Sequence, residues 1–227
     1  MDSTVTQQWW QDTATIRAEI DRLPFLNALA DGTLEHSIFV EYLAQDAHYL
    51  RDYGRVMAML SAIAPTRKAS VFWATTAAES LETEQLLHDS HLSYITAESF
   101  PAPSPTCVMY TSFLLAEATR GNYATLSAAV LPCFCVYDDV GRRLAARVRA
   151  TRPHETDLAW HPYGDWISTY EDDAFSASAA NASALVNEAA ITATAAVRAR
   201  MREVYIMATR CEWMFWQAAW RQERWPV

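Results

Sequence analysis

The chain has 227 residues, of which 51% are hydrophobic and 12% aromatic, and its formal net charge at pH 7 is −9. This composition indicates one folded globule with a sizeable core and excludes an intrinsically disordered chain. The negative charge disfavours a partner with a phosphate backbone, so we expect no nucleic-acid partner. We also expect no membrane partner, because no apolar run approaches the ~20 residues that span a bilayer.

The cysteines and the N-terminal residues bear on the cellular compartment. The four cysteines, at positions 107, 133, 135 and 211, match neither a zinc-ligand spacing nor a disulfide framework. Residues 1–7 have neither the charged start nor the apolar centre of a signal peptide. We therefore expect reduced thiols in a cytoplasmic protein.

The first half of the chain is predicted to be helical, because Gly is rare and helix-forming residues dominate the long segments. The predicted helices cover approximately residues 3–23, 35–64 and 66–92. Pro24 is expected to close the first of them. The loop that follows the third, residues 98–106, contains Pro101, Pro103 and Pro105, which deny that segment a helix.

The second half continues the helical pattern. Its predicted helices cover approximately residues 108–120, 123–150, a short segment after His161-Pro162, a stretch from about Asp173, and residues 192–220. Pro132 is expected to kink or break the second of these, which would place Cys133 at a local helix start. No strand pattern is found, and the sequence predicts an all-α fold: a single-domain helical bundle over residues 1–227 that could enclose a site.

Cys133 is the first candidate for chemistry. A cysteine at a helix start feels the positive end of the backbone dipole, which favours its thiolate. Tyr137 lies four residues later, on the same helical face. The alternative is that Cys133 only fills the core, because free cysteine is among the most buried residue types. Cys135 points elsewhere and is interpreted as a packing residue.

Two carboxylates occupy aromatic, apolar surroundings in the sequence. Asp46 shares a helical face with Tyr42, Tyr49 and other large residues, and Glu212 stands beside Trp213, Phe215 and Trp216. A buried carboxylate is costly unless it is hydrogen-bonded, so each is either paired or poised for a ligand. The alternatives are a surface position for Asp46 and an ion pair with Arg210 or Arg221 for Glu212.

Three tyrosines, Tyr110, Tyr137 and Tyr163, head or enter predicted helices. A buried tyrosine usually only needs one hydrogen-bond partner, so each taken alone is a structural residue. They become functional candidates only if the fold brings them together.

A competing site lies on the third predicted helix. The set consists of Glu79, Glu82, Glu84, His88 and His91. Glu84 and His88 are four residues apart and His88 and His91 are three apart, so these could share one helical face. A carboxylate-bridged di-iron bundle usually takes Glu-x-x-His from two helices, and the sequence has no second copy. We therefore predict no metal, and we keep a metal- or oxygen-dependent enzyme as an alternative.

Four motifs give the chain a family resemblance that covers nearly its whole length. They are Phe-x-x-Tyr-Leu-x-Gln-Asp-x-x-Tyr-Leu from Phe39, Leu131-Pro132-Cys133 with Tyr137 and Gly141, His161-Pro162-Tyr163-x-x-Trp166-Ile167-x-x-Tyr170, and Glu212-x-x-Phe215-Trp216. In this order they make the chain resemble the TenA/thiaminase II family. The resemblance implies a haem-oxygenase-like all-α fold.

The resemblance also implies an activity in thiamin salvage. The family hydrolyses the exocyclic C–N bond of 4-amino-5-aminomethyl-2-methylpyrimidine, and many members hydrolyse thiamin to the same hydroxymethyl pyrimidine. By motif, Cys133 resembles the nucleophile and Glu212 the general acid/base. Asp46 and Tyr49 would bind the ring, and Tyr110, Tyr137 and Tyr163 would orient the thiol and the ring. The resemblance implies no cofactor and a homotetramer.

One further alternative is not an enzyme. A pyrimidine- or thiamin-binding regulatory protein could keep Asp46 and the tyrosines without needing Cys133. Whether the protein needs the Cys133 thiol therefore distinguishes a binding protein from a hydrolase.

Overall fold

The computed structural model describes residues 3–87, 100–155 and 157–227, and within them every regular element is a helix. The helices are α1 (Val5–Asp12), α2 (Ala14–Ile20), α3 (Pro24–Ala30), α4 (His36–Ala62), α5 (Arg67–Leu87), α6 (Pro105–Thr119), α7 (Tyr123–Thr151), α8 (Gly164–Glu171), α9 (Asp173–Thr192) and α10 (Ala195–Trp220). The prediction of an all-α fold is confirmed.

The N-terminal segment differs from the single helix predicted over residues 3–23. It is divided into α1 and α2 at Thr13, whose hydroxyl donates hydrogen bonds to the carbonyls of Trp9 (2.9 Å) and Trp10 (3.2 Å). Such bonds compete with the helical ladder. Pro24 begins α3 instead of closing a helix, because a proline at the first helical position has no N–H that needs a partner.

The second difference concerns α7, which continues through Pro132 without the expected break. Cys133 is therefore in the interior of a 29-residue helix and not at a helix start. Proline removes one backbone hydrogen bond, but tertiary packing can keep the helix intact. Around Pro132 the packing is complete: residues 126–132 are buried, and the Tyr53 hydroxyl donates to the Val130 carbonyl at 3.0 Å.

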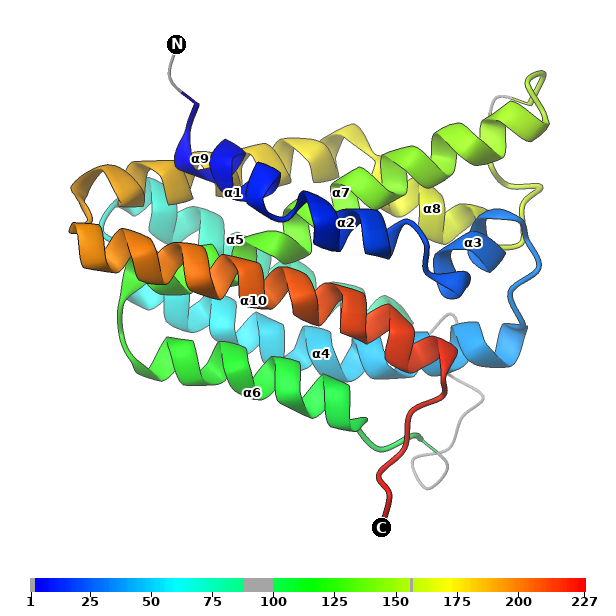
Figure 1. Ribbon diagram of the computed structural model, residues 1–227, viewed down its shortest axis with the longest axis horizontal. Coiled ribbons are helices and arrows are strands. Elements are labelled where there is room, and N and C mark those ends of the chain that lie inside the picture. Colours follow the sequence, from blue (N-terminus) through cyan, green and yellow to red (C-terminus); the bar gives the residue numbers. More distant parts are fainter. Residues whose placement is uncertain (1–2, 88–99, 156) are drawn as a thin grey trace.

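Three long helices, α4, α7 and α10, form the centre of the bundle. Figure 1 shows α4 beside α5 and α6, and α10 running across the molecule with α7 behind it. α8 and α9 pack on α7, while α1 and α2 lie along α9 and α10. Because α4, α7 and α10 are separated by long stretches of sequence, residues they contribute to one site are brought together only by folding.

Among the described helices, α7 has the length and mean hydropathy of a membrane-spanning segment. This corrects the expectation that no segment is long and apolar enough. However, 72% of the apolar stretch is buried inside the protein. Its composition is therefore that of a central core helix.

Candidate active site

A cavity of about 740 Å³ opens between α4, α5, α7, α8 and α9. Its inner end is lined by Asp46, Tyr49, Tyr53, Cys133, Phe134, Tyr137 and Tyr170. The spacing of Asp46, Tyr49 and Tyr53 places these three side chains on one face of α4, and Cys133 and Tyr137 are likewise one turn apart on α7. The volume is in the range of small-molecule sites.

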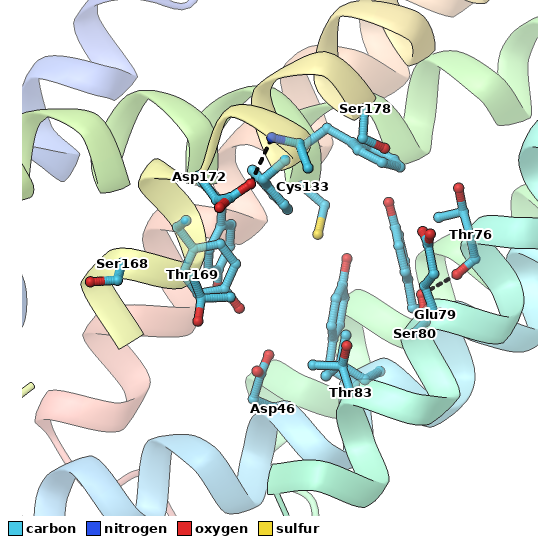
Figure 2. A pocket seen from close by; sticks show the side chains of 18 of the residues that line it. Asp46, Thr76, Glu79, Ser80, Thr83, Cys133, Ser168, Thr169, Asp172 and Ser178 are labelled. Carbon is cyan, nitrogen blue, oxygen red and sulfur yellow. Dashed lines mark hydrogen bonds between the residues drawn. The ribbon is translucent and has the colours of Figure 1, made fainter. Parts of the chain in front are cut away.

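The Cys133 thiol points from α7 into this cavity, with Asp46 across from it (Figure 2). The sequence predicted a thiolate favoured by a helix N-terminus, and this part of the interpretation is wrong, because Cys133 lies within α7. Burial raises the pKa of the thiol well above its usual value, and the nearby charge of Glu212 raises it further. The resting thiol is therefore protonated and needs a base to become a nucleophile.

The two carboxylates are both buried, with Asp46 3% and Glu212 2% exposed. Burial raises the pKa of Asp46 to about 7 and that of Glu212 to about 8; the charge of Asp46 adds to the second shift. The Oδ2 atom of Asp46 has no hydrogen-bond partner among the described residues. Glu212 is bound by a tyrosine and not by Arg210 or Arg221, since the Tyr110 hydroxyl donates to its Oε1 at 2.6 Å.

The tyrosines differ in what they contact. Tyr49 lines the cavity, its ring stacks on Tyr53 with centroids 5.2 Å apart, and its hydroxyl interacts with the Cys133 thiol. The Tyr137 hydroxyl also lines the cavity and shares a 3.1 Å hydrogen bond with Tyr42. Tyr110 does not line the cavity; it positions Glu212.

Tyr163 lies apart from this cluster. Its hydroxyl donates to the Leu34 carbonyl, and its ring packs on Phe39 with centroids 4.7 Å apart. It precedes α8 as the N-cap residue and does not line the cavity. The structure therefore gives Tyr163 the single structural hydrogen bond that a buried tyrosine usually makes.

Sequence reasoning missed three residues at the inner end of the cavity, Tyr53, Phe134 and Tyr170. Tyr170 was part of a quoted motif, and Tyr53 has the i+4 spacing from Tyr49 that could have identified it. Tyr170 is at the end of α8 and reaches the site because α8 packs against α7; its ring is 4.8 Å from that of Tyr137. That contact has no signal in the sequence.

The residues of the competing metal site fall partly within the described part of the chain. Glu79 lines the cavity, whereas His88, His91 and the side chain of Glu84 lie outside the described residues. Within the described part of the chain, no group of three His, Cys, Asp or Glu side chains could hold a metal ion.

Comparison with known sequences defines the family. A profile of the TENA/THI-4/PQQC family matches residues 10–222. The thiamine biosynthesis multifunctional protein ThiED of Corynebacterium efficiens is 39% identical over 96% of this chain, which spans only 28% of that relative's length. The aminopyrimidine aminohydrolase of Bacillus subtilis is 31% identical, over 96% of this chain and 87% of the relative.

Solved structures agree on the fold. A TenA family transcription regulator from Silicibacter sp. TM1040 superposes with a TM-score of 0.81 at 24% identity, covering 96% of both chains. A domain of unknown function with a heme oxygenase-like fold from Shewanella denitrificans gives a TM-score of 0.73 at 15% identity, covering 98% of this chain and 93% of that one. The haem-oxygenase-like fold is thus confirmed, and the chain belongs to the TENA/THI-4/PQQC family.

Proposed function

We propose that the protein is an aminopyrimidine aminohydrolase that cleaves the exocyclic C–N bond of 4-amino-5-aminomethyl-2-methylpyrimidine and, as a second substrate, thiamin. The observation that carries this proposal is a thiol and an unpaired carboxylate facing one cavity, with a second buried carboxylate close to the thiol. The similarity to an aminohydrolase over nearly the whole chain supports it.

The first chemical step is addition of sulfur to the pyrimidine ring. Glu212 in its charged form takes the proton of the Cys133 thiol, and the thiolate forms a bond to a ring carbon. The adduct is electron-rich and expels the amine from the methylene group, with Glu212 returning the proton to the departing nitrogen. A carboxylate whose pKa is raised to about 8 holds and releases a proton near neutral pH, which suits both parts of this step.

The second step restores the enzyme. Water adds to the exposed methylene carbon while Glu212 accepts a proton from it, and the C–S bond breaks so that the ring regains its aromatic electrons. The protonated Glu212 returns that proton to the departing sulfur. The products are ammonia and the hydroxymethyl pyrimidine, and the residues that act are regenerated.

Asp46 and the tyrosines that line the cavity bind the substrate. The unpartnered Oδ2 of Asp46 accepts a hydrogen bond from the ring's amino group, and the carboxyl group shares a proton with the adjacent ring nitrogen, which makes the contact charge-assisted. Tyr49 on α4 and Tyr137 on α7 line the cavity and contact the ring. Tyr110 acts indirectly, by orienting Glu212 through its 2.6 Å bond.

Some properties extend the proposal beyond the site. We propose a homotetramer, by family resemblance, and a cytoplasmic location, because all four cysteines are free. We propose no nucleic-acid partner, since four arginines that follow one another closely on α7, Arg142, Arg143, Arg147 and Arg149, are each paired with an acidic side chain. Sedimentation analysis of the purified protein tests the assembly.

The decisive experiment assays the aminomethyl pyrimidine and thiamin side by side, scored by release of ammonia and of the thiazole. Wild-type protein is expected to hydrolyse the first at least. Cys133→Ser is expected to abolish turnover while retaining pyrimidine binding. Cys135→Ser, two residues away, is the matched control and should remain active. Unchanged turnover in Cys133→Ser would refute the covalent route, and iron-dependent turnover would favour the metal alternative.

A further inference from the structure

The cavity is larger than the pyrimidine that the proposed reaction requires. The ring with its substituents has about ten non-hydrogen atoms, far fewer than a cavity of about 740 Å³ accommodates. The inner end, around Asp46, Tyr49 and Cys133, is buried or half-buried, whereas Glu79, Asp165 and Asp172 on the lining are exposed. We call these exposed acids, with the hydroxyl residues between them, the outer wall.

The outer wall is acidic on opposite sides of the opening. Glu79 comes from α5, while Asp165 and Asp172 come from α8 and the start of α9 (Figure 2 shows Glu79 and Asp172). No lysine, arginine or histidine is among the described residues that line the cavity. The net potential there is negative, in a chain whose net charge is already −9.

The hydroxyls of the outer wall do not offset this charge. The hydroxyls of Thr76, Ser80 and Thr169 each donate to a backbone carbonyl of their own helix, at 3.1, 2.8 and 2.9 Å. Their protons are therefore used, and they present lone pairs to the cavity.

The start of α9 does not attract an anion either. A free helix N-terminus binds phosphate, but here the Asp172 carboxylate already accepts the hydrogen bond of the Ala174 N–H at 2.6 Å. The charged side chains of the described outer wall are thus all carboxylates, and its remaining polar side chains, Thr83, Ser168 and Ser178, are neutral hydroxyls.

That a ligand occupies this cavity is indicated independently by its inner end. Asp46 is 3% exposed, and its Oδ2 atom has no hydrogen-bond partner among the described residues. Buried polar atoms are normally satisfied, so this oxygen indicates a bound molecule. With the ring held there, its 5-methylene substituent extends past Cys133 toward the outer wall.

We propose that the outer wall selects the leaving group. The enzyme accepts pyrimidines whose methylene carries a neutral or cationic nitrogen group, and it rejects pyrimidines whose leaving group bears a phosphate ester. This inference rests on the proposed function and specifies its substrate class. A protonated amine or a cationic heterocycle gains from the acids, whereas a phosphate meets three carboxylates and no lysine, arginine or histidine among the described lining residues to neutralise it.

The test compares thiamin with thiamin monophosphate, which differ only by the phosphate on the leaving group. Binding to Cys133→Ser is measured by calorimetry, so that turnover does not interfere. Thiamin is expected to bind about tenfold or more tightly than its phosphate at low ionic strength, and the ratio should shrink toward 150 mM salt as exposed charges are screened.

Two charge reversals on α5 supply the matched pair of variants. Glu79→Lys, on the outer wall, should reduce the affinity ratio by about threefold or more. Glu82→Lys, exposed on the same helix but not on the cavity lining, should leave the ratio unchanged.

The proposal is overturned if both ligands bind equally, if neither binds, or if Glu82→Lys changes the ratio as much as Glu79→Lys. Failure of the proposed function is recognised separately, because wild-type protein would then release no ammonia from the aminomethyl pyrimidine.

Discussion

Four carboxylates are buried within the described part of the chain, and they form two contrasting pairs: Glu41 and Glu117 against Asp46 and Glu212. Arg224 binds both carboxylate oxygens of Glu41 at 2.9 Å, and Arg200 binds Glu117. These two acids hold the C-terminal tail to α4 and α10 to α6.

The second pair, Asp46 on α4 and Glu212 on α10, has no cation as a partner among the described residues. Asp46 lines the cavity, and Glu212 is bound by the Tyr110 hydroxyl. Without a guanidinium, burial raises their pKa to about 7 and about 8. The comparison teaches that burial can make a carboxylate without an arginine partner, such as Asp46 or Glu212, a proton carrier near neutral pH.

The largest expected effect is on catalysis by the unpaired acid. Glu212→Gln should lower kcat by ~10²-fold or more, because the amide can neither accept the thiol proton nor return it to the amine. Glu117→Gln, an equally buried acid paired with Arg200, is the control and should keep most of its activity. Steady-state ammonia release measures both. Equal losses in the two variants would remove the functional distinction between the pairs.

A second test uses pH and stability. The pKa values of Asp46 and Glu212 are raised in the folded state, so that state binds more protons than the unfolded chain between about pH 4 and 8. Stability must therefore fall as pH rises through that window, by an amount on the order of a few kcal/mol.

Urea unfolding at pH 5 and pH 8 measures this contribution. The double variant Asp46→Asn/Glu212→Gln should lose much less stability than wild type between the two pH values, because its amides do not titrate. If the two proteins show the same pH dependence, the raised pKa values are contradicted.

The paired acids are tested by removing a cation. Arg224→Met should lower the free energy of unfolding by about 1–2 kcal/mol, because the 8%-exposed Glu41 then lacks its counter-charge. Arg22→Met, which breaks an exposed pair with Glu19, should change it by less than about 0.5 kcal/mol. Adding Glu41→Gln to Arg224→Met should recover part of the loss, and no recovery would argue against an unpaired charge as the cause.

The smallest effect is expected at Asp46. Asp46→Asn should raise KM about tenfold with little change in kcat, because an amide keeps one acceptor oxygen but loses the charge that strengthens the contact with the ring. Calorimetry with the hydroxymethyl pyrimidine separates binding from turnover. A purely catalytic defect with unaltered affinity is the result that contradicts a binding role.

Much of the site could be predicted because its residues recur at helical spacing. Asp46 with Tyr49, and Cys133 with Tyr137, are one turn apart, so local periodicity already places each pair on one face. Residue spacing could not decide whether Asp46 lies at the surface, or whether Glu212 forms an ion pair with Arg210 or Arg221. Both depend on contacts such as the bond from Tyr110, 102 residues away from Glu212.

The sequence by itself determined the helical class and the motifs that give the family resemblance, because helix propensity and periodicity are local properties. Only the tertiary structure decided that α7 runs unbroken through Pro132, that the half-buried Cys133 faces the cavity with a raised thiol pKa, and that Tyr163 lies elsewhere while Tyr170 reaches the cavity. These outcomes depend on which helices pack together. Desolvation, which sets the pKa of each acid and of the thiol, exists only once those helices enclose the site.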